Sequence, residues 1–218
     1  MSDTDSFISE VTDEVRREKL YGYLRRYGWI AIVCVLALVG GAALTEYRAA
    51  QSRAAAEATG DALLDALEQG DAAARAAALT GVDTEGASAA VALLLQASTQ
   101  QEAGDTEAAA ETLNRLALSP DVPALYRDLA AFKAAMLPVA ETETRKLALE
   151  TLAAPGQPFS LLAQEQLAYI ALDEGDTEAA VAMLRRIEED AAVTRGLRDR
   201  VQTLMVALGE PLADPQNQ

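Results

Sequence analysis

The feature that most constrains this chain is an uncharged run of 19 residues, from Tyr27 to Thr45. As an α-helix rising about 1.5 Å per residue, the run would reach roughly 28 Å, close to the ~30 Å hydrocarbon thickness of a bilayer. A helix is the expected form, because lipid offers no hydrogen-bond partner to an open backbone. We therefore predict a transmembrane helix over 27–45. Its expected anchor residues are the large apolar ones: Trp29, Ile30, Ile32, Val33, Val35, Leu36, Leu38 and Val39.

Two other interpretations of this run are weaker. Apolar runs of about 10–14 residues are usually core helices, but a run of 19 with aromatic and basic flanks usually is not. A cleavable signal peptide would need a 26-residue leading region that carries six acidic residues, which is atypical of such peptides. The membrane span is therefore favoured over both.

The flanking charges predict the orientation of the span. The basic residues on its N-terminal side are Arg16, Arg17, Lys19, Arg25 and Arg26, whereas Glu46, Arg48 and Arg53 follow it. Loops rich in Lys and Arg stay in the cytoplasm. We expect a cytoplasmic N-terminus and about 170 residues on the far side. The reverse topology, with a cytoplasmic domain, is the alternative.

The segment 1–26 is predicted to be cytoplasmic, amphipathic and basic. Phe7, Val11 and Val15 recur every fourth position, as on one face of a helix, and charged residues fill much of the rest. Two roles stay open for this segment: docking on a partner or at the membrane surface, or only a topology signal. At the other end, residues 209–218 hold two prolines and little apolar content, so we predict a disordered tail.

Composition argues against several classes of function. The chain has a net charge of −16, and the part after Thr45 carries 13 basic and 28 acidic residues. Nucleic-acid binding relies on Lys and Arg, so no such partner is expected. The chain has no histidine, and its single cysteine, Cys34, lies inside the apolar run. With neither a Gly-rich phosphate loop nor metal-ligand spacing, we predict no catalytic residue, metal, cofactor or small-molecule substrate.

The domain after the span contains a repeated turn. Its copies are Gly70-Asp71, Gly104-Asp105 and Gly175-Asp176. They are separated by 34 and 71 residues, and a period near 34 is typical of stacked helix–turn–helix units. In such a turn Gly takes the left-handed position that ends one helix, and Asp caps the start of the next.

Other helix breakers complete an all-α prediction for residues 46–208. A turn that lacks the Gly-Asp signature is expected near residue 139, at Pro138. The second helices should end at three further breaks, 80–85, 119–123 and 154–158. The expected architecture is four helical hairpins and a final helix over about 193–208, with Tyr126, Phe132, Phe159 and Tyr169 as the larger core residues. Because no Gly or Pro occurs between Thr45 and Gly60, the membrane helix should continue into the first hairpin.

These turns resemble those of the tetratricopeptide repeat. The best match combines Leu167 and Ala168 before the Gly175-Asp176 turn with Ala180 and Leu184 after it. The layout of the chain, with its Arg-Arg-Tyr-Gly entry at 25–28, resembles a bacterial single-span tetratricopeptide-like family described as an ancillary subunit of the Sec translocon. The resemblance implies an inner-membrane protein with a periplasmic α-solenoid that contacts translocon subunits, periplasmic chaperones or client proteins.

The main hypothesis is therefore a membrane-anchored interaction scaffold. Its partner surface would be the inner face of the array, lined by the first helix of each hairpin. The candidate residues are Gln96, Gln100, Arg127, Gln164 and Gln166, each of which is alternatively only a solvated position. A second hypothesis is a self-associating structural envelope protein, in cell-wall or division complexes, whose Ala-rich faces pack chain against chain.

Overall fold

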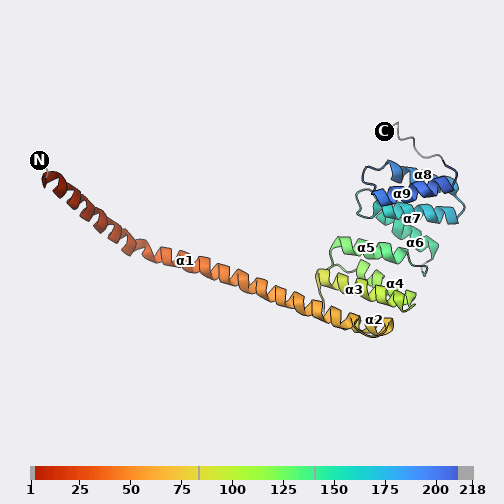
Figure 1. The fold of residues 1–218 in the computed structure, drawn as a ribbon, viewed down its shortest axis with the longest axis horizontal. Helices are drawn as coiled ribbons and strands as arrows, with labels where there is room; N and C mark the ends of the chain where they lie inside the picture. The colour runs from red at the N-terminus through yellow and green to blue at the C-terminus, as the bar shows by residue number, and fades with distance from the viewer. Residues whose placement is uncertain (1–2, 83, 140, 211–218) are drawn as a thin grey trace. The chain divides into compact units, whose positions relative to one another are not determined.

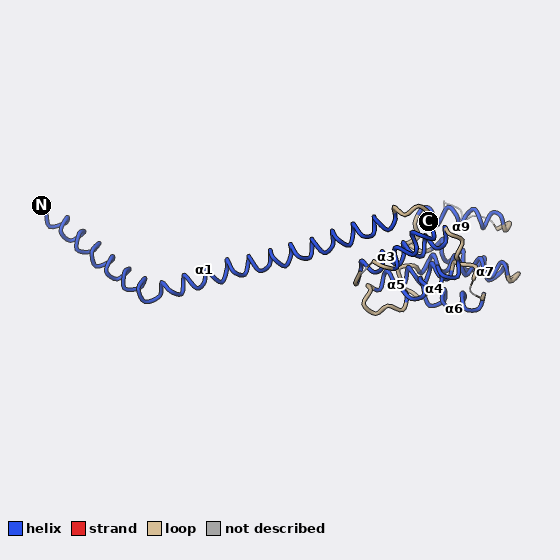
Figure 2. Tube along the Cα trace, turned by 90° about the horizontal axis from the view of Figure 1, so that it is seen from below, coloured by secondary structure: helices blue, strands red, loops and turns tan. Residues whose placement is uncertain are grey.

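The computed structural model describes residues 3–82, 84–139 and 141–210, and the side chains of residues 1–24, 26–28, 31 and 32 are outside this description. Every regular element of the described residues is an α-helix, and none of them forms a strand (Figure 2). In chain order the helices are α1 (Asp3–Leu67), α2 (Ala72–Thr80), α3 (Gly86–Glu102), α4 (Thr106–Ala117), α5 (Ala124–Ala135), α6 (Thr142–Leu152), α7 (Ser160–Asp173), α8 (Thr177–Glu189) and α9 (Arg195–Ala207). The predicted all-helical class is confirmed.

The chain divides into two compact units, residues 1–58 and 59–218. The first unit contains the greater part of α1. The second begins with the last turns of α1, and from α2 onward each helix packs against the next one in the sequence (Figure 1). Helix α3 also packs against α5. The core of the second unit is thus built between neighbours in the sequence.

Aspartate side chains cap the N-termini of three helices, α2, α4 and α8. Asp71, Asp105 and Asp176 accept hydrogen bonds from the backbone N–H three residues further on, at 2.7, 3.0 and 3.0 Å respectively. Each carboxylate satisfies a backbone donor that the first turn of a helix leaves free. The capping role predicted for the three aspartates is confirmed.

The glycines of the three turns differ from one another. Gly104 and Gly175 are left-handed, with φ of 82° and 84°. Just after them, the N–H groups of Asp105 and Asp176 reach back to carbonyls five residues earlier, at 2.9 and 2.8 Å. This is the Schellman ending of a helix. Gly70 does not have positive φ, so the left-handed prediction is wrong there.

The connection around Gly70 is longer than the connections around Gly104 and Gly175. Residues 68–71 separate α1 from α2, whereas residues 103–105 and 174–176 separate the helices at the other two turns. The longer connection contains four residues rather than three, and it reverses the chain without a left-handed residue.

A further turn of the same kind closes α9. Gly209 has φ of 81°, and the N–H of Glu210 donates to the carbonyl of Met205 at 3.0 Å. Gly209 follows Gly175 by 34 residues. The prediction of a disordered tail is therefore wrong for residues 209 and 210, because backbone hydrogen bonds order them. Residues 211–218 lie outside the described residues.

The other breaks lie where the sequence places them. The ranges 80–85, 119–123 and 154–158 fall at the α2–α3, α4–α5 and α6–α7 connections. Pro138 lies between α5 and α6, and the final helix is α9. Helix propensity and chain breakers are local properties, which is why sequence alone locates these boundaries.

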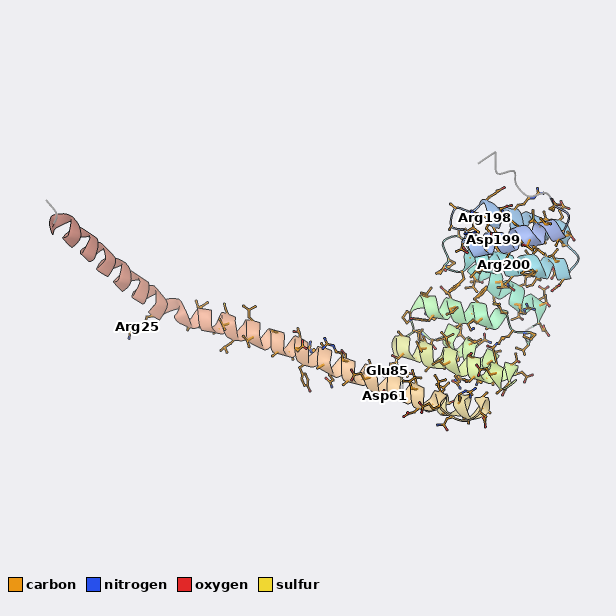
Figure 3. The ribbon with its side chains drawn as sticks, in the orientation of Figure 1. Arg25, Asp61, Glu85, Arg198, Asp199 and Arg200 are labelled. Carbon is orange, nitrogen blue, oxygen red and sulfur yellow. The ribbon has the colours of Figure 1, made fainter. Side chains whose placement is uncertain are left out.

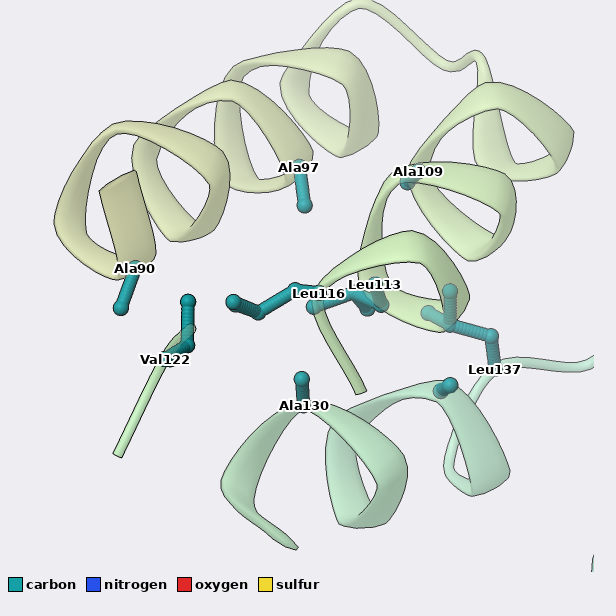
Figure 4. Close-up of a cluster of buried hydrophobic side chains, with 9 residues drawn as sticks. Ala90, Ala97, Ala109, Leu113, Leu116, Val122, Ala130 and Leu137 are labelled. Carbon is teal, nitrogen blue, oxygen red and sulfur yellow. The ribbon is translucent and has the colours of Figure 1, made fainter. Parts of the chain in front are cut away.

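Three apolar clusters form the core, each shared by consecutive helices. Leu113 and Leu116 of α4 are fully buried between α3 and α5 (Figure 4). Leu149 lies in the cluster of α5, α6 and α7, where the rings of Phe132 and Phe159 stack with centroids 5.9 Å apart. Leu184 lies in the cluster of α7, α8 and α9. Tyr169 is 38% exposed, so its predicted role as a core residue is wrong.

Candidate membrane anchor and partner surface

The described side chains of the apolar run are exposed on α1. The exposed fraction of the described anchor side chains ranges from 41% for Ile30 to 75% for Leu38. These side chains are Trp29, Ile30, Val33, Val35, Leu36, Leu38 and Val39, whereas the side chain of Ile32 lies outside the described residues. A soluble core helix would bury such residues. Helix α1 is long and apolar enough to cross a membrane.

Aromatic side chains mark both ends of the apolar run. Trp29 and Tyr47 are both mostly exposed. They are 18 positions apart in one helix, which corresponds to about 27 Å at 1.5 Å per residue. Trp and Tyr favour the two interfaces of a bilayer. Tyr47 is thus a further candidate anchor residue, at the C-terminal end of the run, that was not predicted. Its spacing of 18 residues from Trp29 could have indicated this role.

Charged residues flank the run on both sides. Arg25 is exposed (Figure 3). The side chains of Arg16, Arg17, Lys19 and Arg26 lie outside the described residues, so their role in topology stays a prediction. Beyond the run, Arg53 lies 3.5 Å from Glu46 on the same helix, and both side chains are largely exposed.

The predicted partner residue Gln96 is buried. Its side chain is 6% exposed, and its Nε2 donates to the Thr80 hydroxyl of α2 at 2.8 Å. This face of α3 is covered by α2, so the prediction that Gln96 lies on a partner surface is wrong. Gln100, one turn later, is half-buried, and its Oε1 is buried without a hydrogen-bond donor among the described residues.

The remaining predicted partner residues are half-buried. Arg127 is on α5, and Gln164 and Gln166 are on α7. Gln164 and Gln166 are two positions apart on α7 and therefore face different sides of the helix, and the five predicted residues are divided among α3, α5 and α7. Contact of Arg127, Gln164 and Gln166 with a partner stays a prediction.

An ion pair between α7 and α9 was not predicted. Glu165 is 4% exposed, and its two oxygens accept from Nε and Nη2 of Arg200 at 2.8 and 2.7 Å. This two-point geometry is the strong form of an Arg–carboxylate contact. The hydrogen bonds to Glu165 raise the pKa of Arg200, against the opposing effect of burial. The available sequence signal was the separation of 35 residues, close to one period of the repeat.

A shallow hollow lies beside this ion pair. Its volume is about 400 Å³, and it is lined by Tyr169 of α7 and by Asp199, Arg200, Thr203, Leu204 and Ala207 of α9. Asp199 and Arg200 are marked on α9 in Figure 3. The lining combines an aromatic ring and aliphatic groups with a charged edge. Such a surface can accept an apolar side chain of a protein partner.

Three other ion pairs connect helices that follow one another in the sequence. Arg75 of α2 lies 2.9 Å from Glu102 at the end of α3, and Lys146 of α6 lies 3.0 Å from Glu174 at the end of α7. Arg185 of α8 pairs with Glu210 just after α9. In each, a basic residue of one helix pairs with a glutamate at the C-terminal end of the following helix. The hydrogen bond to Glu174 raises the pKa of Lys146.

No arrangement of the described side chains points to a metal ion. Groups of three or more His, Cys, Asp or Glu residues with suitable geometry do not occur among them. Comparison of the chain with protein-family models, with curated proteins and with solved structures gives no match.

Proposed function

We propose that this chain is a membrane-anchored scaffold for protein–protein interaction. The observation that carries the proposal is α1, which exposes its apolar residues from Trp29 to Val39 and continues without a break to Leu67. An exposed apolar helix requires lipid or protein around it. The proposal assigns no catalytic residue, cofactor or small-molecule substrate to the chain.

The proposed architecture of the domain is a tetratricopeptide-like α-solenoid of four hairpins and a last helix. Support comes from the recurrence of one turn geometry at Gly104, Gly175 and Gly209, with φ between 81° and 84°. Packing of consecutive helices, together with that of α3 on α5, is consistent with stacked hairpins. Such arrays display extended surfaces that hold peptides or helices of other proteins.

The proposed location is a bacterial inner membrane, with the N-terminus in the cytoplasm and the domain in the periplasm. Support comes from the basic residues before the span and from the layout shared with the translocon-associated family. The partners proposed on that resemblance are translocon subunits, periplasmic chaperones or their clients. An activity reporter fused after Gln218 tests the orientation, and activity only in the cytoplasm would overturn it.

Site-specific photo-crosslinking in native membranes tests the scaffold itself. A photoreactive residue at Thr203, in the hollow between α7 and α9, should crosslink to a translocon or chaperone component. The same residue at Leu147, which is 67% exposed on α6, is the matched control and should give fewer crosslinks. Equal crosslinking at both positions, or none to any envelope protein, would contradict the proposal. Crosslinks only between copies of this chain would support the self-associating alternative.

A further inference from the structure

We propose that α1 contains a hinge at Gly60, which lets the domain pivot relative to its anchor. Gly60 lies where α1 passes from a stretch whose side chains are exposed to a stretch that packs against the rest of the domain. The proposal does not depend on the identity of any partner.

The burial of side chains along α1 changes within a few residues. Side chains from Glu46 to Ala58 are exposed, except for the half-buried Ala49. Thr59 and Gly60 are half-buried, and Ala66 is 5% exposed. The boundary between the two compact units also falls between Ala58 and Thr59. Packing therefore stabilises α1 on one side of this boundary and not on the other.

Gly60 is not required by the packing of the domain. A Cβ atom at this position would meet nothing within 4 Å, and the backbone is not left-handed. Alanine would fit there, as it does at seven positions from Ala49 to Ala62. In a helix interior glycine is less favourable than alanine by about fivefold in the local equilibrium. The residue thus weakens the helix at the boundary without a compensating contact.

Like charges weaken the same turn. Glu57, Asp61 and Asp65 are exposed and follow one another at intervals of four residues; Asp61 is marked in Figure 3. Carboxylates at this spacing are neighbours on a helix surface and repel each other. The sequence has no Lys or Arg between Arg53 and Arg75 to offset them. This effect is independent of Gly60 and acts at the same residues.

The two effects together make residues 59–63 the preferred place to open in the part of α1 that follows Thr45. Helix bends arise where the backbone ladder is weakest, and glycine is one of their usual causes. A hinge here would leave the membrane segment and the hairpins internally rigid. The domain could then follow a partner that moves at the membrane surface.

Hydrogen exchange of the full chain in detergent micelles tests where the helix opens. In the natural protein, amides of residues 59–63 should exchange faster than those of residues 50–55. Gly60→Ala should slow exchange at 59–63 by about fivefold. Asp61→Lys should slow it by about twofold, because the introduced ammonium group would pair with Glu57 and Asp65.

Ala54→Gly is the control for this experiment. It places a glycine in the unsupported part of the same helix, so it should create a second fast region around residue 54. Uniform rates over 50–63 in the natural protein, or no response to Gly60→Ala, would overturn the hinge.

Spin labels test the motion. In a Cys34→Ala background, cysteines placed at Gln51 and Glu107, both exposed, would carry one label on each side of Gly60. The distribution of distances between the labels should be broad in the natural sequence and narrower with Gly60→Ala. An unchanged width would show that the pivot lies elsewhere, and the proposal would fail.

Discussion

Glu165 is the only buried charged side chain among the described residues. Its carboxylate is removed from water and is compensated by the guanidinium of Arg200, which is itself about half exposed. Removing one partner of such a pair costs more than the pair contributes, because the other charge stays buried and unpaired. We therefore expect the contact to fix the position of α9 relative to α7 more than it adds net stability.

Arg200→Ala should lower the free energy of unfolding by about 2 kcal/mol, less than for a fully buried pair because Arg200 is half exposed. Chemical unfolding of the full chain in detergent, followed by circular dichroism, measures it. Arg198→Ala, on the same helix as Arg200, is the matched control, because the Arg198 side chain has no described carboxylate within 4 Å. This variant should lower the free energy of unfolding by less than about 0.5 kcal/mol. Glu165→Gln in the Arg200→Ala background should recover part of the loss. Equal effects of the two arginine variants would contradict the role assigned to the ion pair.

Glycines at equivalent turns should respond differently to alanine. Gly175 is left-handed, with φ of 84°, so Gly175→Ala should destabilise by about 1–2 kcal/mol through backbone strain. Gly70 has no positive φ and no atom within 4 Å of a Cβ, so Gly70→Ala should be neutral or stabilise by up to about 1 kcal/mol. Thermal unfolding of the two variants under the same conditions distinguishes them. A comparable loss for Gly70→Ala would show that its turn is left-handed in solution.

Sequence reasoning succeeded at residues whose role is local. The capping of Asp105 and Asp176 depends on the few residues around them, so the pattern was sufficient. It failed for Gln96, because the burial of that side chain depends on Thr80 of α2, which lies 16 residues earlier. It also missed Arg200, whose partner Glu165 lies on another helix.

At the scale of elements, helix ends were the most predictable feature. Side-chain caps begin α2, α4, α8 and α9, and glycine or proline lies in most connections between the helices from α2 onward, signals that are independent of tertiary contacts. The continuity of α1 followed from the absence of Gly and Pro between Thr45 and Gly60. The turn at Gly209 and Glu210 was missed, because the two prolines that follow it suggested a tail. Glu210 belongs to the domain through its ion pair with Arg185, a contact between helices that no local pattern reveals.

The membrane role of α1 can be tested with a single charge. Leu38, which is 75% exposed near the middle of the apolar run, should not tolerate arginine, because a charged side chain at the centre of a membrane helix costs about 3 kcal/mol. The fraction of Leu38→Arg that stays with membranes after alkaline carbonate extraction should fall well below that of the natural protein. Gln51→Arg, beyond the run on the same helix, is the control and should be retained. Full retention of Leu38→Arg would contradict a bilayer-spanning α1.

At the scale of the whole molecule, stability is distributed along the chain. The cluster around Leu113 joins α3, α4 and α5, whereas the cluster around Met205 joins α7, α8 and α9. The cluster that contains Leu149 connects these two regions. A domain held together by contacts between neighbouring helices loses stability locally when one cluster is damaged. This organisation could be expected from the period of the sequence, but the members of each cluster could not.

Truncation in one cluster should therefore act mainly on its own helices. Leu113→Ala should destabilise by about 2–5 kcal/mol, through lost burial and the cavity that remains. Hydrogen exchange should accelerate most in α3, α4 and α5, and less in α8 and α9. Met205→Ala should give the reverse pattern. Equal acceleration across all helices in both variants would show instead that the domain unfolds as one cooperative unit.

The continuity of α1 has a consequence for rotation. Each residue of an α-helix advances the chain by about 1.5 Å and turns it by about 100°. One residue inserted into 46–58 would therefore turn the domain by more than a quarter of a circle about the helix axis, whereas about seven would nearly restore its heading and move it outward by about 10 Å. This angular register holds while the helix at residues 59–63 stays closed, because its backbone hydrogen bonds fix the turn from each residue to the next. Under the proposed membrane anchoring, an insertion into residues 46–58 would therefore change which side of the domain faces a neighbour in the same bilayer.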